Sequence, residues 1–214
     1  MHYAPDTALV VVDVQNDFAD PEGSLAVAGG EAVVRACNAE IAAARAAGAS
    51  VLYTQDWHPA STPHFAKDGG TWPVHCVAGT WGADLHPALT VDGPVVRKGS
   101  NGEDGYSGFT MRDPRGGETI PTALDGTLRA LGIVRVVVVG LATDYCVHAT
   151  ALDARSLGYD TVVLRDAVAA VDLQAGDGER ALDELGVAGV TVEGEPAQTV
   201  AASATSQMPA STGG

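Results

Sequence analysis

The sequence Arg135-Val-Val-Val-Val-Gly-Leu-Ala-Thr-Asp-Tyr-Cys146 decides the fold of this chain. Its four consecutive valines predict a strand over 135–140 that is buried on both faces, because a half-buried strand would alternate apolar and polar residues. The residues that follow predict a helix over 144–157, with Cys146 in its first turn. A buried strand followed directly by a helix is the unit from which parallel α/β sheets are built.

The rest of the chain repeats this alternation of strand and helix. Short runs rich in β-branched residues predict further strands at 8–14, 50–55, 94–97, 161–164 and 187–192. Helical spacing of apolar residues predicts helices at 31–47, 122–131 and 178–185. We therefore predict a single-domain α/β protein with a mostly parallel, Rossmann-like β-sheet and helices on both faces. The domain is assigned to residues 1–200, and the segment 201–214 is predicted to be a disordered tail.

The composition argues against several classes of function. The net charge is −15, whereas binding to nucleic acid or to an anionic membrane needs a basic surface. No apolar run reaches the roughly 20 residues that span a bilayer, and no basic leader precedes the first apolar run. Three widely spaced cysteines do not suggest a disulfide framework, so we expect free thiols and a cytoplasmic location.

Four chemically capable residues follow four of the predicted strands. In chain order they are Asp13, Asp56, Lys98 and Cys146. The carboxyl ends of parallel strands form one edge of the sheet, and ligands bind at that edge in open α/β folds. We therefore expect these four side chains to lie close together.

Cys146 is a candidate nucleophile. Free backbone N–H groups and the helix dipole in a first helical turn favour a thiolate. The N–H groups of Ala142 and Cys146 could also bind an oxyanion that develops on a substrate. The position by itself is equally compatible with a buried structural cysteine, which is the role expected for Cys37 and Cys76.

A thiol nucleophile needs a proton acceptor, and no histidine is an obvious partner for Cys146. Asp13 is the candidate base, because a carboxylate that closes an apolar strand is costly unless it is paired. Lys98 supplies a charge that can pair with Asp13 and stabilise a thiolate. A purely structural ion pair between Asp13 and Lys98 is the alternative, and it would be favoured if the pair were considered alone.

A second cluster lies in the aperiodic segment 56–92. Asp56, His58, His64 and His75 fall within twenty residues, and this segment holds most of the histidines in the chain. Imidazole and carboxylate ligands suit zinc, iron or manganese, so we predict one divalent metal ion, with zinc favoured. Separate surface or hydrogen-bonding histidines are the alternative, and the clustering disfavours it.

Aromatic residues accompany both clusters, namely Phe18, Trp72 and Tyr106. A flat apolar ligand would suit such a set. Ordinary loop packing is a strong alternative for each of the three considered singly.

Seven short motifs together resemble the nicotinamidases of the isochorismatase-like cysteine hydrolase family. They are Val11-Val-Asp-Val-Gln-Asn-Asp-Phe18, Gln55-Asp-Trp-His-Pro59, His64-Phe65, Trp72-Pro-Val-His-Cys76, Arg97-Lys-Gly99, Tyr106-Ser-Gly-Phe109 and Gly140-Leu-Ala-Thr-Asp-Tyr-Cys-Val147. They run in the order of the family, and no single one of them is specific. The motifs of the 56–92 segment distinguish nicotinamidases from metal-free relatives.

The resemblance implies specific roles at the strand ends. Asp13, Lys98 and Cys146 match the catalytic triad of the family. A cis peptide bond between Leu141 and Ala142 is implied as well, and it makes the Ala142 N–H part of the oxyanion hole.

The resemblance also implies roles for the second cluster and the aromatic residues. Asp56, His58 and His75 match the metal ligands, and His64 is a further ligand that the family places less uniformly. The metal is expected to hold the nitrogen of a pyridine ring, which lies between the side chains at the positions of Phe18, Trp72 and Tyr106. The acidic stretch 102–105 lies in a loop that varies among relatives, so its role stays open.

The expected activity is hydrolysis of nicotinamide, or a similar pyridine carboxamide, to nicotinate and ammonia through a thioester, in NAD salvage. The expected partner is this small molecule, with no nucleic acid and no membrane, and a homo-oligomer is left open. One alternative is a related cysteine amidohydrolase that acts on another small amide. The others are a metallohydrolase whose ion activates water and a catalytically silent metal-binding protein on the same fold.

Overall fold

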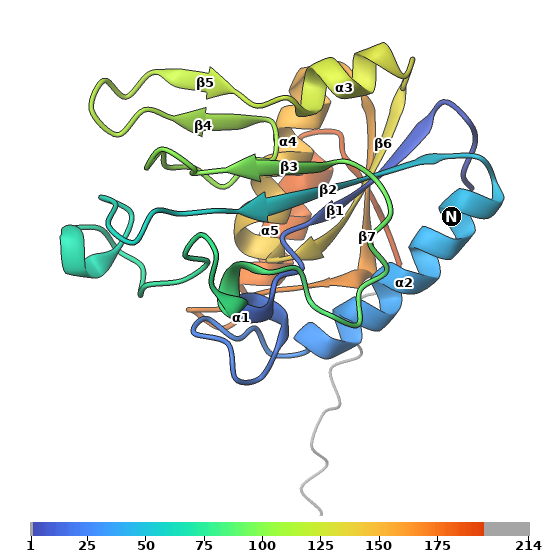
Figure 1. Ribbon diagram of the computed structural model, residues 1–214. Coiled ribbons are helices and arrows are strands. Elements are labelled where there is room, and N and C mark those ends of the chain that lie inside the picture. The colour runs from blue at the N-terminus through green and yellow to red at the C-terminus, as the bar shows by residue number, and fades with distance from the viewer. Residues whose placement is uncertain (1, 195–214) are drawn as a thin grey trace, which may run out of the picture.

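The computed structural model describes residues 2–194 of the chain. Its main sheet consists of β1 (Thr7–Val12), β2 (Ser50–Asp56), β3 (Val95–Lys98), β6 (Arg135–Leu141), β7 (Asp160–Ala169) and β8 (Thr191–Glu193). The spatial order is β3-β2-β1-β6-β7-β8, and every pair of neighbours runs parallel (Figure 1). The predicted parallel α/β fold is confirmed.

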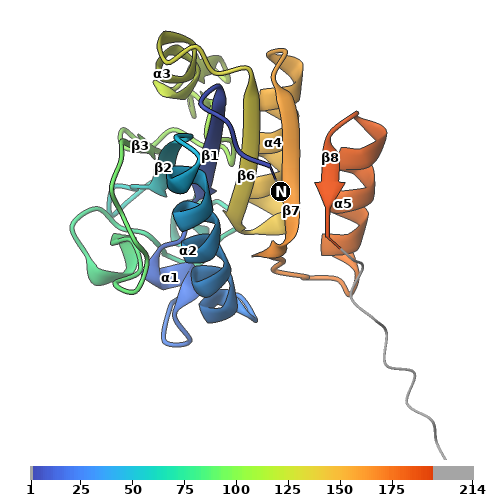
Figure 2. The same ribbon diagram turned by 90° about the vertical axis from the view of Figure 1, so that its right-hand side faces the viewer.

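Helices cover both faces of this sheet, as predicted. They are α1 (Asn16–Ala19), α2 (Gly30–Ala46), α3 (Leu124–Ala130), α4 (His148–Ser156) and α5 (Asp177–Val187). The long α2 and the short α1 pack against one face, while α3, α4 and α5 pack against the other. In Figure 2, α2 lies in front of the sheet and α4 lies behind it.

The central strand β1 is buried on both sides. Leu9 and Val11 pack on the α2 side together with Cys37, and Val10 and Val12 pack on the opposite side. All five residues are at most 1% exposed, and burial of such a side chain stabilises the fold by roughly 1.5–3 kcal/mol for the aliphatic ones. The continuous apolar runs of the sequence are therefore explained by helices on both faces rather than by a membrane.

Two boundaries near the end of the described chain differ from the sequence prediction. β7 continues to Ala169 instead of ending at residue 164. The last strand, predicted at 187–192, is confined to β8 because α5 continues through Val187, which is 92% exposed. An exposed valine at a helix end is indistinguishable in sequence from the first residue of a strand. The predicted tail at 201–214 lies outside the described residues.

The segment 99–117, in which the sequence predicts no strand or helix, contains part of a small hairpin. β4 (Thr110–Arg112) pairs with β5 (Thr119–Pro121) in the antiparallel direction. The turn between them is stabilised by Asp113, whose carboxylate accepts two backbone N–H groups within the turn. Strands of three residues are too short to display the alternation that reveals a strand in sequence.

The strand order places the site between β1 and β6. Chain connections lead from β1 towards β2 and β3 and from β6 towards β7 and β8, so the winding reverses between these two strands. In open parallel sheets, ligands bind beyond the carboxyl ends of the strands at this reversal. In Figure 1 the arrowheads of β2 and β3 point into the long loops that complete this edge of the sheet.

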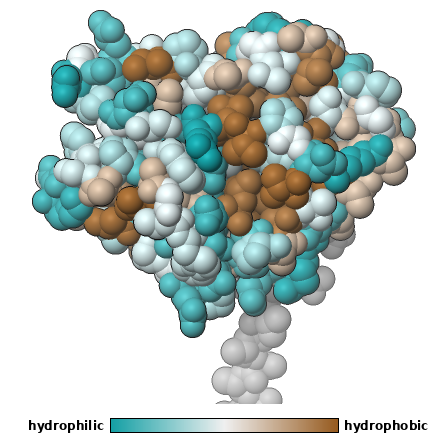
Figure 3. All heavy atoms as spheres, viewed as in Figure 1, coloured by the Kyte–Doolittle hydropathy of each residue, from teal (hydrophilic) through white to brown (hydrophobic). Residues whose placement is uncertain are grey.

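The surface is mixed in polarity. On the face that Figure 3 presents, apolar residues gather near the middle and polar residues form most of the rim. Within residues 2–194, no helix is long and apolar enough to cross a membrane.

Gly140 of β6 leaves no space for a side chain. Its φ is +114°, and a Cβ atom at this position would lie 2.2 Å from the carbonyl oxygen of Val12. We expect Gly140→Ala to lower the free energy of unfolding by about 3 kcal/mol or more, measured by urea denaturation. Gly126→Ala is the matched control, because nothing lies within 4 Å of a Cβ atom in this turn of α3. It should be neutral or stabilise by up to about 1 kcal/mol, and equal losses in both variants would contradict the prediction.

Candidate active site

Lys98, the last residue of β3, lies at the centre of the residues at the carboxyl ends of the strands. Its Nζ is 3.0 Å from Asp13 Oδ2 and 3.7 Å from Cys146 Sγ. It also makes a short ion pair with Asp56. All four residues are buried, and buried charges are tolerated only when they are paired. The structure therefore brings together the four side chains that the strand ends predicted, with one ammonium group facing two carboxylates and a thiol.

Asp13 is held rigidly at the end of β1. Its backbone is left-handed, with a φ of 47°, and its Oδ1 accepts a hydrogen bond of 2.6 Å from Thr54 Oγ1. Burial raises the pKa of Asp13, Lys98 opposes the rise, and Asp56 adds to it. A carboxylate with a raised pKa is a stronger base near neutral pH, which suits an acceptor of the thiol proton.

Burial dominates the electrostatic environment of the Cys146 thiol. Burial raises the pKa of the thiol well above its ordinary value, and Lys98 counteracts this only in part. A thiol with a raised pKa ionises when a base removes its proton, which is the role predicted for Asp13, and the predicted contribution of the helical turn to a thiolate stays a prediction. The nearby carboxylates of Asp13 and Asp56 raise the thiol pKa further, because they disfavour a third negative charge.

The turn that carries Cys146 begins one residue earlier than predicted. A π-helical turn at Thr143–Val147 leads into α4, and the Ala142 carbonyl accepts N–H groups from Tyr145 and Val147. A cis peptide bond joins Leu141 to Ala142, as the resemblance implies. Ala142 and Cys146 line the same pocket. Their assignment to an oxyanion hole stays a prediction.

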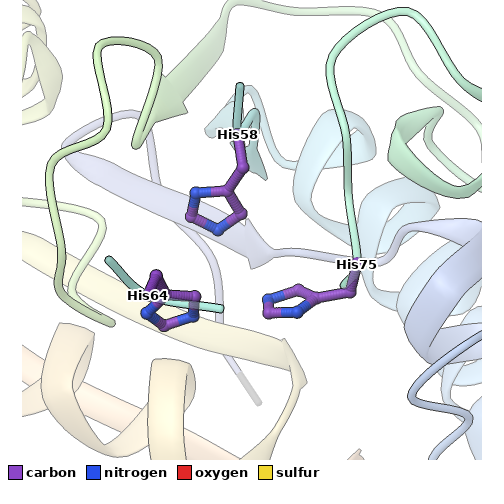
Figure 4. A group of neighbouring side chains, drawn as sticks. All are labelled: His58, His64 and His75. Carbon is purple, nitrogen blue, oxygen red and sulfur yellow. The ribbon is translucent and has the colours of Figure 1, made fainter. Parts of the chain in front are cut away.

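Three histidines form the second cluster. The rings of His58, His64 and His75 come from separate parts of the 56–92 segment and face one another (Figure 4). One nitrogen from each ring lies within 4.8 Å of the others, and all three residues are buried. Burial lowers the pKa of His75 to about 4, so this imidazole is neutral at neutral pH, as metal binding requires.

The surroundings of these histidines fit a divalent cation. Neither nitrogen of the buried His58 has a hydrogen-bond partner among the described residues. A buried imidazole in that state is costly unless a lone pair binds a cation. Zinc, iron and manganese all accept several imidazole ligands together with a carboxylate.

Asp56 lies between the two clusters. Its carboxylate pairs with Lys98, and its Oδ1 is 3.8 Å from His58 Nε2. Although burial opposes it, Lys98 holds the pKa of Asp56 well below its ordinary value, and His58 and His75 add to this effect. Of the four predicted metal ligands, the structure therefore groups the three histidines tightly, with Asp56 beside them.

A pocket opens onto both clusters. It is lined by Phe18, Leu25, Asp56, His64, Trp72, His75, Tyr106, Ala142, Tyr145, Cys146 and Val171. The three aromatic residues predicted to hold a ring, Phe18, Trp72 and Tyr106, are all in this lining. The Trp72 indole donates a hydrogen bond of 3.0 Å to the Tyr106 hydroxyl, which fixes both rings. A flat apolar ligand would therefore meet preorganised aromatic walls.

Sequence reasoning missed a fourth aromatic residue. Tyr145 lines the pocket and packs edge-on against Trp72 and Tyr106, with ring centroids 4.9 and 5.2 Å apart. Its position directly before Cys146 was the only available signal.

Two further polar residues support the site without having been predicted. Gln15 holds the backbone of Asp56 by two hydrogen bonds of 2.8 Å, one to its carbonyl and one from its N–H. Asp144 accepts the N–H groups of Val171 and Asp172, each at 2.9 Å, and so holds a segment of the pocket wall. Both residues lie two positions from a predicted triad residue, but this spacing does not reveal their partners.

Asp104 is a third missed polar residue, from the acidic stretch whose role the sequence left open. Its Oδ1 lies 2.7 Å from His64 Nδ1. This hydrogen bond lowers the pKa of Asp104 to about 2, so the carboxylate is ionised.

Comparisons with known proteins assign the family. The model of the isochorismatase domain matches residues 7–193. The nicotinamidase of Escherichia coli strain K12 is 39% identical over 206 residues, which cover 88% of this chain and 94% of that protein. The chain therefore belongs to the isochorismatase family, and within it the chain is a hydrolase that acts on an amide.

Solved structures agree with this assignment. The pyrazinamidase of Pyrococcus horikoshii in complex with zinc is similar, with a TM-score of 0.78 and 39% identity over 88% of this chain and 99% of that one. PnC1 from L. infantum in complex with nicotinate has a TM-score of 0.81 and 39% identity, over 90% of this chain and 95% of that one. The resemblance to nicotinamidases that the seven motifs indicated is confirmed.

Proposed function

We propose that this chain is a nicotinamidase, a metal-assisted cysteine amidohydrolase that converts nicotinamide to nicotinate and ammonia. The observation that carries the proposal is one aromatic-walled pocket lined by Cys146 and by His64 and His75, two of the three clustered histidines. A pyridine carboxamide has a flat ring, a ring nitrogen and an amide carbon, and the pocket offers a matching group for each. Relatives named as nicotinamidases and a similar structure in complex with nicotinate support this choice.

The first half of the reaction forms an acyl-enzyme. Asp13 takes the proton of Cys146, and the sulfur attacks the carboxamide carbon while the carbonyl π electrons move to oxygen. Lys98 stabilises the negative charges of the sulfur and of Asp13, and the N–H groups of Ala142 and Cys146 bind the oxyanion. The C–N bond then breaks as Asp13 returns the proton to nitrogen, so ammonia leaves and a thioester remains.

The second half returns the free enzyme. Asp13 accepts a proton from water, and the resulting hydroxide attacks the thioester carbon. The C–S bond breaks, nicotinate is released, and the Cys146 sulfur takes back the proton from Asp13. One carboxylate thus serves as base and acid in turn, which the raised pKa of Asp13 favours.

The histidine cluster and Asp56 would hold one divalent metal ion, for which we favour zinc because a similar pyrazinamidase is in complex with zinc. A bound ion would supply a Lewis acid for the pyridine nitrogen. The chain's own residues orient the ring: Trp72 and Tyr106 are fixed by their mutual hydrogen bond, and Phe18 contributes a further part of the wall.

The product indicates the metabolic pathway to which the reaction belongs. Nicotinate is a precursor for pyridine nucleotide synthesis, so we assign the enzyme to NAD salvage. A cytoplasmic location, expected from the cysteine pattern, stays a prediction, and so does any homo-oligomer.

The role of the ring nitrogen in substrate recognition can be tested with an amide that lacks it. Benzamide retains the ring and the carboxamide of nicotinamide but lacks the ring nitrogen. If the ion holds that nitrogen, kcat/KM should be about 100-fold or more lower for benzamide than for nicotinamide. Ring burial barely differs between the two amides, so such a difference would reflect the missing nitrogen. The measurement compares both amides on the same zinc-loaded enzyme, with mass spectrometry of quenched samples to detect an acyl-enzyme.

The alternative in which the ion activates water makes the opposite prediction. Benzamide would then be hydrolysed about as well as nicotinamide, and no covalent adduct would form. Equal kcat/KM values without an adduct would overturn the proposed mechanism. Failure to hydrolyse either amide would overturn the assignment itself.

A further inference from the structure

Asp104 contacts the histidine cluster from outside. It lies 40 positions from His64 in the sequence, yet its Oδ1 and His64 Nδ1 are 2.7 Å apart. Its side chain is 36% exposed, whereas that of His64 is 7% exposed. The carboxylate therefore faces the solvent on one side and the buried imidazole on the other.

The contact determines which nitrogen of His64 can bind a cation. A carboxylate oxygen at this distance accepts a hydrogen bond from the imidazole, so Nδ1 serves as the donor to Asp104 and Nε2 is the nitrogen left to face a cation. His75 follows the same pattern, because its Nδ1 lies 2.7 Å from the carbonyl oxygen of Pro73. Two of the three rings in Figure 4 thus have an oxygen acceptor at Nδ1, which leaves Nε2 for a metal.

The small hairpin holds Asp104 in place. Asp104 and Arg112 of β4 exchange backbone hydrogen bonds of 2.9 and 2.6 Å. The Gly105 N–H donates to Asp104 Oδ1 at 2.9 Å, and Arg112 Nη2 lies 3.4 Å from the other carboxylate oxygen. The backbone bonds fix where the carboxylate lies, so its contact with His64 does not depend on a flexible side chain alone.

We propose that Asp104 is a positioning residue of the metal site, which fixes the His64 ring and its tautomer so that Nε2 binds the ion directly. The proposal rests on the metal centre of the proposed function and not on the identity of the substrate. On this proposal the acidic stretch 102–105 and the β4–β5 hairpin serve to position the His64 ring, and His64 coordinates the ion directly. Carboxylates that accept the second N–H of a metal-bound histidine orient the ring and make the ligand more basic.

The test is the affinity of the metal-free protein for zinc, measured by competition with a chromophoric chelator and without any substrate. Asp104→Ala should raise the zinc Kd by about 10- to 100-fold. Asp104→Asn, which keeps a neutral acceptor, should raise it by less. Glu118→Gln is the matched control, because it removes one negative charge from an exposed position close to the same hairpin. It should change the Kd by less than about twofold, since a distant exposed charge is screened.

A double-mutant cycle separates positioning from general damage to the hairpin. In a His64→Ala background, Asp104→Ala should raise the zinc Kd by less than about twofold, because the ring through which Asp104 acts is absent. If Asp104→Ala lowers the zinc affinity tenfold in both the wild-type and the His64→Ala background, the proposal is overturned. An unchanged zinc Kd in the single variant Asp104→Ala would overturn it as well. These outcomes do not depend on whether the enzyme hydrolyses nicotinamide.

Discussion

Cys146→Ala should reduce turnover of nicotinamide by at least about 10³-fold and leave the fold and the zinc content unchanged. Without the sulfur no thioester can form, and the remaining groups can only position water. Cys146 does not belong to the group formed by His58, His64 and His75, so the substitution should leave zinc binding by these histidines unchanged. The measurements are ammonia release, metal analysis and circular dichroism of the variant.

Cys37→Ala provides the matched control. Cys37 lies on the buried face of α2 and does not line the pocket. Its replacement should keep kcat near the wild-type value while lowering the free energy of unfolding by about 1–2 kcal/mol. Iodoacetamide should modify Cys146 before Cys37 or Cys76. A Cys146→Ala variant with substantial activity would refute the covalent mechanism and favour an ion that activates water.

Asp13→Asn and Lys98→Met should each lower kcat by about 10³-fold or more. Asparagine keeps the shape of Asp13 but cannot accept the thiol proton, and methionine keeps the stem of Lys98 without its charge. Lys98 contacts two carboxylates and the thiol, so the three residues should act as one unit. Residues that act as a unit are strongly non-additive, and the double variant should therefore be about as slow as either single variant.

Stability separates the two roles of this ion pair. Lys98→Met leaves the buried carboxylates of Asp13 and Asp56 without their cation and should cost about 3–5 kcal/mol of stability. Asp13→Asn should cost less, because Lys98 keeps its partner Asp56. If Asp13→Asn folds normally and turns over at near the wild-type rate, Asp13 and Lys98 form only a structural ion bridge.

The burial pattern of the sheet could be predicted because it follows from local sequence. Four consecutive valines place apolar side chains on both faces of a strand. The strand at residues 135–140 must therefore be covered on both sides, and α2 and α4 cover it. Asp13 and Lys98 were predicted at the ends of two strands. Their proximity then followed from the rule that the carboxyl ends of parallel strands form one edge of the sheet. The hairpin of β4 and β5 could not be predicted in this way, because strands of three residues take their stability from tertiary contacts.

The sequence also predicted the members of both clusters, with Asp56 expected beside the histidines and among the residues at the strand ends. The structure adds that Asp56 forms an ion pair with Lys98. Tyr145 and Asp104 were missed because a side chain becomes part of a site through its neighbours in space. Nothing in the spacing of residues 64 and 104 indicates a hydrogen bond of 2.7 Å.

By itself the sequence determined the fold class, the residues that follow the strands, and the composition of the thiol and histidine clusters. These properties depend on apolar periodicity and on residue type, which are local and readable. Tertiary structure alone decided the direction in which the pKa of Cys146 shifts, since the burial that raises this pKa and the opposing charge of Lys98 come from different strands. It likewise decided the contact of Asp104 with His64, because the hairpin brings together segments 40 residues apart. Distances between such segments depend on the packing of the whole sheet and its loops, which no single stretch of sequence encodes.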